Sequence, residues 1–85
     1  MILGFGDKET EKIYNREFSR KLPQAIQITA FRKLVYMDNA KILDDLRVPP
    51  ANRFEQWSIR INSQYRICFT VRDNGFDNVT ITDYH

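Results

Sequence analysis

Cysteine and histidine are nearly absent from this chain of 85 residues, which has one of each, Cys68 and His85. One thiol cannot form an internal disulfide, and there is no cluster of cysteine and histidine to bind structural zinc, so a reducing cytosol is the expected compartment. The sequence also lacks an apolar run of bilayer length, and the short apolar start at residues 1–6 meets charged residues too soon for a signal peptide. We therefore expect a soluble, cytoplasmic protein with no membrane partner.

A strong excess of charge is missing too. Lys and Arg number 13 against 11 Asp and Glu, and the resulting net charge of +2 is too small to indicate a nucleic-acid partner by itself. Any such argument must rest on where the basic residues lie. With 85 residues, 42% of them hydrophobic, and no repeat or low-complexity tract, the chain should form one domain over residues 1–85. That size leaves little room for a buried cofactor site with its own lid.

The first half of the sequence predicts one short strand and two helices. The strand is expected over residues 1–6, and the first helix over residues 8–16, where Asp7 can accept hydrogen bonds from the free amides of the first turn. A second helix should follow Pro23. Its apolar positions form one stripe at helical spacing, which suits packing on a sheet: Ile26, Ala30, Leu34 and Met37.

The second half predicts antiparallel sheet, because residues 57–72 alternate between apolar and polar side chains. If residues 62–64 form a three-residue loop, Ile59 faces Ile67 on the apolar side and Arg60 faces Arg66 on the polar side. The predicted fold class is therefore α+β, a small antiparallel sheet with two N-terminal helices on one face.

A second loop of the same length, placed at residues 74–76, would bring Arg66 opposite Tyr84. It would also align Thr70 with Thr80. Arginine, tyrosine and the terminal histidine would then meet at one end of the sheet, a combination that suggests RNA chemistry.

Two arginines that oppose each other are mildly destabilising, so Arg60 and Arg66 indicate an anion site, with RNA phosphate as the candidate ligand. The alternative is that both are solvated, or that they pair with Asp83 and Glu55. The third candidate is His85, because histidine is the residue type whose unperturbed titration lies near neutrality, which suits proton transfer in cleavage by a neighbouring 2′-hydroxyl. Its alternative is a frayed terminus.

Tyr84 could orient a base or donate a proton, and its alternative is an ordinary strand aromatic. Three residues beside the double proline are secondary candidates for contact with backbone phosphate, although each also suits a solvated loop: Arg47, Asn52 and Arg53. Cys68 falls on the polar face by alternation, but no base is near it in sequence, and it is assigned no role.

At this point the chain resembles a known family through four segments: 45–55 (DLRVPPANRFE), 56–62 (QWSIRIN), 64–69 (QYRICF) and the terminal 83–85 (DYH). They are similar to the HigB group of the RelE-like toxins. That resemblance implies the toxin of a bacterial toxin–antitoxin pair, an endoribonuclease that cuts messenger RNA in the A site of the translating ribosome, without a metal or organic cofactor. It further implies a helix-turn-helix antitoxin of the HigA type as partner, with operator DNA bound only through that antitoxin.

Carried over position by position, the resemblance places the family's catalytic residues on Arg66, Tyr84 and His85. The candidates for RNA binding stay those chosen from the residues themselves: Arg60, Arg47, Asn52 and Arg53. The sequence departs from the family between Glu55 and Gln56, where a short basic loop that contributes a lysine is absent. Because phosphate cleavage needs charge stabilisation, this absence supports a second reading, a loop-deleted, weak or inactive toxin that binds its antitoxin and acts as co-repressor. A free-standing DNA-binding domain is disfavoured, because no recognition-helix pattern occurs.

Overall fold

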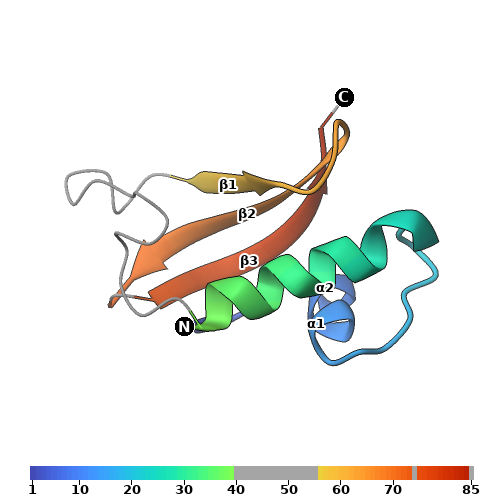
Figure 1. Ribbon diagram of the computed structural model, residues 1–85. Coiled ribbons are helices and arrows are strands. Elements are labelled where there is room, and N and C mark those ends of the chain that lie inside the picture. The colour runs from blue at the N-terminus through green and yellow to red at the C-terminus, as the bar shows by residue number, and fades with distance from the viewer. Residues whose placement is uncertain (40–55, 74, 85) are drawn as a thin grey trace.

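The computed structural model describes residues 1–39, 56–73 and 75–84. In chain order its elements are α1 (Lys8–Tyr14), α2 (Gln24–Asn39), β1 (Trp57–Arg60), β2 (Tyr65–Arg72) and β3 (Gly75–Asp83). The strands form one sheet in the order β1-β2-β3, and both pairs are antiparallel. Both helices lie on the same side of the sheet, with α2 running along it (Figure 1). The predicted α+β class is confirmed.

Asp7 begins α1 as predicted, since its carboxylate accepts a hydrogen bond of 2.8 Å from the backbone N–H of Thr10. The helix ends at Tyr14, two residues before the predicted end, and Arg16 then has a positive φ of 64°. On α2 the four residues predicted for the apolar stripe are the four that are buried. They pack with Ile13 against the apolar face of β2 and β3, which is formed by Ile67, Phe69, Val71, Phe76, Val79 and Ile81.

The predicted N-terminal strand pairs with β3, but only at two isolated positions. Ile2 bridges Phe76 and Phe5 bridges Val79, both in parallel orientation. Between the two bridged residues of β3 lies Asn78, whose φ of 52° breaks the regular extended backbone and with it the ladder. Residues 1–6 therefore extend the sheet at its β3 edge without forming a continuous strand.

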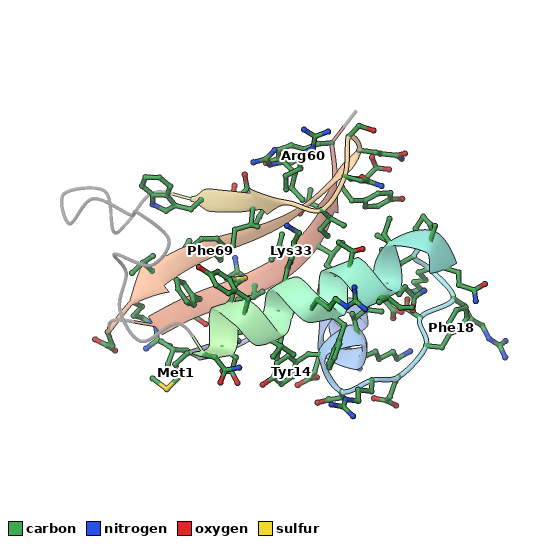
Figure 2. All side chains as sticks on the ribbon, viewed as in Figure 1. Met1, Tyr14, Phe18, Lys33, Arg60 and Phe69 are labelled. Atoms are coloured by element: carbon green, nitrogen blue, oxygen red, sulfur yellow. The ribbon has the colours of Figure 1, made fainter. Side chains whose placement is uncertain are left out.

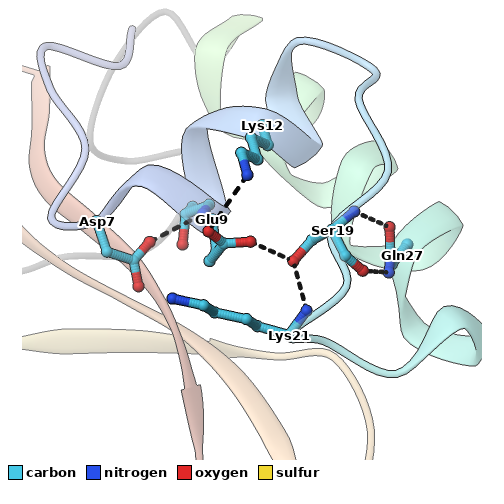
Figure 3. Close-up of polar contacts among 7 residues, drawn as sticks. Asp7, Glu9, Lys12, Ser19, Lys21 and Gln27 are labelled. Atoms are coloured by element: carbon cyan, nitrogen blue, oxygen red, sulfur yellow. Dashed lines mark hydrogen bonds and ion pairs between the residues drawn. The ribbon is translucent and has the colours of Figure 1, made fainter.

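The loop between the helices is fixed by a buried serine (Figure 3). The hydroxyl of Ser19 donates to Glu9 at 2.5 Å and accepts from the backbone N–H of Lys21 at 3.2 Å. Its backbone N–H and carbonyl both bond the side-chain amide of Gln27, at 3.2 and 2.8 Å. The hydrogen bond from Ser19, followed by the charge of Lys12, lowers the pKa of Glu9 despite partial desolvation. These bonds join α1, the loop and α2 into one unit beneath the sheet.

Within the ranges that the structure describes, no helix is both long and apolar enough to cross a membrane.

Candidate active site

The polar face of the sheet, which points away from the helices, carries the two opposed arginines as predicted. Arg60 on β1 is the Cα partner of Arg66 on β2, in the register that also pairs Ile59 with Ile67. Arg60 is exposed and Arg66 is half-buried. Figure 2 shows Arg60 at the end of the sheet that lies far from Met1. Two positive charges therefore share one site at that end of the sheet.

Neither arginine forms an ion pair with another residue of the described ranges, where the ion pairs involve Lys12 and Arg72. Asp83, one of the two acidic partners considered for them, accepts a hydrogen bond of 3.1 Å from the side chain of Gln64. Glu55, the other predicted acidic partner, lies outside the described residues. The electrostatic cost of opposing the two guanidiniums thus has no carboxylate from the described residues to offset it.

Arg66 is held in place by Ser58, a residue that the sequence argument did not select. The Nε–H of Arg66 donates to the Ser58 hydroxyl oxygen at 2.7 Å. A guanidinium carries five N–H donors in a planar fork, so this bond uses one donor and leaves the two terminal amino groups for another acceptor. An anchored arginine whose outer edge remains available is the arrangement required for bidentate contact with a phosphate.

The register predicted for the second turn is wrong. Arg66 pairs with Thr82, not with Tyr84, and Thr70 pairs with Asp77, not with Thr80. The turn is shorter than predicted, because Arg72 pairs with Gly75, and a shift of register between Cys68 and Thr70 then changes the alignment of the rest of the strand. Gly75 belongs to the strand, where Leu3 lies so close that a Cβ would approach it to 2.7 Å.

Tyr84 nevertheless lies on the polar face, although it does not pair with Arg66. It follows β3 directly, and its backbone N–H donates to the carbonyl of Gln64 at 2.5 Å. Its hydroxyl oxygen lies 3.6 Å from the sulfur of Cys68. The side chain is 48% exposed, which leaves its ring accessible to a base. Tyr84 and Arg66 therefore share one face, although they are not direct partners across the strands.

The contact with Cys68, and to a smaller degree desolvation, raises the pKa of Tyr84, whereas the positive charge of Arg66 acts in the opposite direction. Because a phenol already titrates near pH 10, this residue is neutral at physiological pH. It can donate a hydrogen bond or a proton but cannot serve as a base there. Cys68 itself is buried, at 2% exposure. The alternation of side chains correctly placed it on this face, but its contact with Tyr84 was not foreseen.

Four other predicted site residues lie outside the described ranges: Arg47, Asn52, Arg53 and His85. Their proposed roles in RNA binding and proton transfer remain predictions. Among the residues that the structure describes, no group of three or more His, Cys, Asp or Glu side chains could hold a metal ion.

A cavity of about 490 Å³ lies elsewhere, between α1, the loop after it and α2. Its lining includes two exposed apolar side chains, Phe18 and Ile28, and the Phe31 ring, over which the Arg16 guanidinium lies at 5.2 Å. Figure 2 places Phe18 and Arg60 at well-separated parts of the molecule. Apolar walls suit a hydrophobic partner and not a phosphate, so the polar face of the sheet, and not this cavity, is the candidate site for an anion.

Comparison with known proteins agrees with the fold described above. The family model described as "RelE-like toxin of type II toxin-antitoxin system HigB" matches residues 3–85. The chain belongs to this family of RelE-like HigB toxins. A type II system pairs its toxin with an antitoxin, so membership in the HigB family implies an antitoxin partner for this chain.

The chain is also similar to two individual proteins. The chain is 44% identical to a protein named Toxin HigB-1 from Vibrio cholerae serotype O1, over 93 residues that cover 99% of this chain and 94% of the relative. It is 33% identical to an uncharacterized protein from Haemophilus influenzae, over 67 residues that cover 69% of this chain and 66% of the relative. The first alignment spans 93 residues and this chain has 85, so that relative carries residues with no counterpart here.

Proposed function

We propose that this HigB-family toxin is an endoribonuclease that cuts messenger RNA on the translating ribosome, in the cytoplasm. The observation that carries the proposal is the pair of opposed arginines, Arg60 and Arg66, which no described carboxylate neutralises and beside which Tyr84 places a neutral hydroxyl. An RNA phosphate between the guanidiniums would turn their repulsion into a favourable interaction, because each arginine could then face an anion.

In the proposed reaction the 2′-oxygen of one nucleotide attacks the adjacent phosphorus, and the bond from phosphorus to the 5′-oxygen of the next nucleotide breaks. The 2′-hydroxyl loses a proton and the leaving 5′-oxygen gains one, so the products are a 2′,3′-cyclic phosphate and a 5′-hydroxyl. Negative charge builds on the phosphate oxygens in the transition state, where the free amino groups of Arg66 would stabilise it. Proton transfer and charge stabilisation can both come from side chains, so the proposed mechanism includes no metal.

We assign one role to each side chain. Arg66 stabilises the phosphate, and Tyr84, which is neutral, orients the substrate or donates a proton, since the raised pKa excludes it as base. His85 is the proposed proton-transfer group. The four remaining candidates are proposed to bind the RNA backbone: Arg60, Arg47, Asn52 and Arg53. With so few proton-transfer groups, cleavage depends on a substrate held in a reactive geometry, and this supports dependence on the ribosome.

The test maps 5′ ends on a defined messenger after the purified chain is added to ribosomes stalled with a filled P site. The expected result is a set of cuts in phase with the codon in the A site. A single 2′-deoxynucleotide at the cut position should abolish cleavage there, because it removes the attacking oxygen. Cleavage that persists at the 2′-deoxynucleotide would refute the proposed chemistry.

A second candidate function is a catalytically weak or inactive toxin that acts as an antitoxin-binding module and co-repressor. It is favoured by the longer alignment with Toxin HigB-1 of Vibrio cholerae, which is compatible with the loss of a loop from this chain. We propose that the lost residues are the basic loop expected between Glu55 and Gln56. An intact messenger, together with tight binding of a HigA-type antitoxin and of operator DNA only in its presence, would establish this alternative.

A further inference from the structure

Ser58 lies on the polar face of the sheet, and its contact with Arg66 is specific but has no evident role in folding. It lies on β1 directly opposite Cys68 on β2. Arg66 comes two residues before Cys68 on β2 and is therefore the diagonal neighbour of Ser58. Diagonal neighbours on an antiparallel sheet are close enough for a long side chain to bridge them. Arg66 does so, and its Nε reaches the Ser58 hydroxyl at 2.7 Å.

We propose that Ser58 is a positioning residue for the RNA-cleaving reaction, which acts by fixing the orientation of the Arg66 guanidinium. This inference rests on the proposed function of Arg66. Ser58 itself is not required to touch RNA, because its effect passes through the arginine.

The need for such a residue follows from the charge directly across the sheet. Arg60 is the Cα partner of Arg66, so like-charge repulsion favours conformations in which the Arg66 guanidinium swings away from it. The hydroxyl of Ser58 opposes that movement, because it accepts from Nε and ties the plane of the guanidinium to β1. The two terminal amino groups of Arg66 are then held in a fixed orientation. A transition state gains most from donors that are already oriented, since they need not reorganise during the reaction.

Tyr84 is held to the same part of the face through a different residue. Its hydroxyl meets the sulfur of Cys68, which is the Cα partner of Ser58. Two small polar side chains, opposite each other on neighbouring strands, thus hold one proposed catalytic side chain each. The Arg66 Nε–H bonds Ser58 and the Cys68 thiol bonds Tyr84, so a change at Cys68 separates loss of the serine hydroxyl from general disturbance of this strand pair.

The first experiment measures single-turnover cleavage on programmed ribosomes for Ser58→Ala, Ser58→Thr and the wild type. Loss of one hydrogen bond to a charged group predicts a rate constant lowered about tenfold in Ser58→Ala, with an unchanged half-saturating toxin concentration. Ser58→Thr keeps the hydroxyl and should restore most of the rate. In an Arg66→Ala background Ser58→Ala should cause no further loss. A wild-type rate in Ser58→Ala, or the same loss in both backgrounds, would overturn the proposal.

A second experiment tests, independently of RNA cleavage, whether Ser58 fixes the Arg66 guanidinium. The side-chain Nε–H of Arg66 is followed by NMR in the wild type and in Ser58→Ala, Ser58→Thr and Cys68→Ala. Slow exchange with water is expected in all of them except Ser58→Ala. An Nε–H that exchanges equally fast in Ser58→Ala and in the wild type would refute the positioning role. Failure of the proposed function would appear separately, as a wild type that leaves the messenger intact.

Discussion

Replacement of Arg60 by glutamine should stabilise the free protein while it weakens RNA binding. Arg60 directly opposes Arg66 on the polar face and has no ionic partner among the described residues. A like-charge pair in this position costs roughly 0.2–1 kcal/mol, and the low end suits an exposed side chain that water and salt screen. For a domain of this size, about 1 kcal/mol corresponds to 4–8 °C in Tm, so Arg60→Gln should raise Tm by about 1–8 °C, with the lower part of that range expected.

The assay is thermal unfolding at low and at high ionic strength, with sulfate as a mimic of phosphate. Added sodium chloride should reduce the difference between Arg60→Gln and the wild type, because the Debye length falls from about 10 Å at 0.1 M to about 3 Å at 1 M. Sulfate should raise the Tm of the wild type more than that of the variant, since only the wild type presents both guanidiniums.

Arg72 provides a matched control, because it too is an exposed arginine of the sheet, although on β2, and it is paired with Asp77 at 3.0 Å and Asp73 at 3.4 Å. Arg72→Gln should not raise Tm and should leave the response to sulfate unchanged. An Arg60→Gln variant that is less stable than the wild type at low salt would refute the reasoning. Equal responses of both variants to sulfate would do the same, because the opposed pair would then not be the anion site.

Three further predictions concern the site and its support. Tyr84→Phe keeps the ring but removes the hydroxyl, so cleavage should slow about tenfold with RNA affinity unchanged; an equal rate would exclude a role for the hydroxyl. The Thr10 hydroxyl accepts a hydrogen bond from the buried N–H of Ile81 at 2.9 Å. Thr10→Val should therefore lower the free energy of unfolding by about 1–3 kcal/mol and speed hydrogen exchange of that amide, whereas Thr10→Ser should keep the amide protected. Hydrogen bonds from the backbone of residue 2 and from Tyr14 lower the pKa of Asp38, so the stability that Asp38 contributes should be complete above about pH 4 and fall as pH drops further. Tyr14→Phe should lower the free energy of unfolding by about 1 kcal/mol at neutral pH. In denaturant titrations its free energy of unfolding should fall less steeply with decreasing pH, and an unchanged slope would contradict this assignment.

The periodicity of apolar side chains predicted the long helix and, with an assumed three-residue loop, the first hairpin. On residues 57–72 alternation separates an apolar from a polar face, and matching like faces across a loop at residues 62–64 gives the register that pairs Arg60 with Arg66. The apolar stripe of α2 was equally informative, because a period of 3.6 residues gave all four of its buried positions. In both segments a shift by one residue would expose the apolar face, so the pattern determines the packing.

The second hairpin could not be predicted in the same way, because its alternation is interrupted. A register shift lies between Cys68 and Thr70, and Asn78 has a positive φ, so one face is not continuous along β3. Gly75 was assigned to the loop because a three-residue turn was assumed, but here its missing side chain makes room for Leu3, which is distant in the sequence. Tertiary packing of this kind leaves no local signal.

For the site, residue type was informative only where the side chain is chemically distinctive. Arg66 and Tyr84 were selected by their charge and aromatic ring, and the structure places both on the polar face. Ser58 was missed because a serine on the polar side of a strand is common, and only the 2.7 Å contact with Nε distinguishes it. The signal that would have found it is positional, since it is the diagonal neighbour of the proposed catalytic arginine.

The most direct test of this account is the single-turnover rate of messenger cleavage on ribosomes, compared between Arg66→Ala and Arg72→Ala. Both changes remove one exposed or half-exposed positive charge from β2, but only Arg66 lies beside Tyr84 and opposite Arg60. The account predicts a loss of at least about a hundredfold for Arg66→Ala, as for removal of a transition-state donor, and a nearly wild-type rate for Arg72→Ala. Equal rates in the two variants would contradict it.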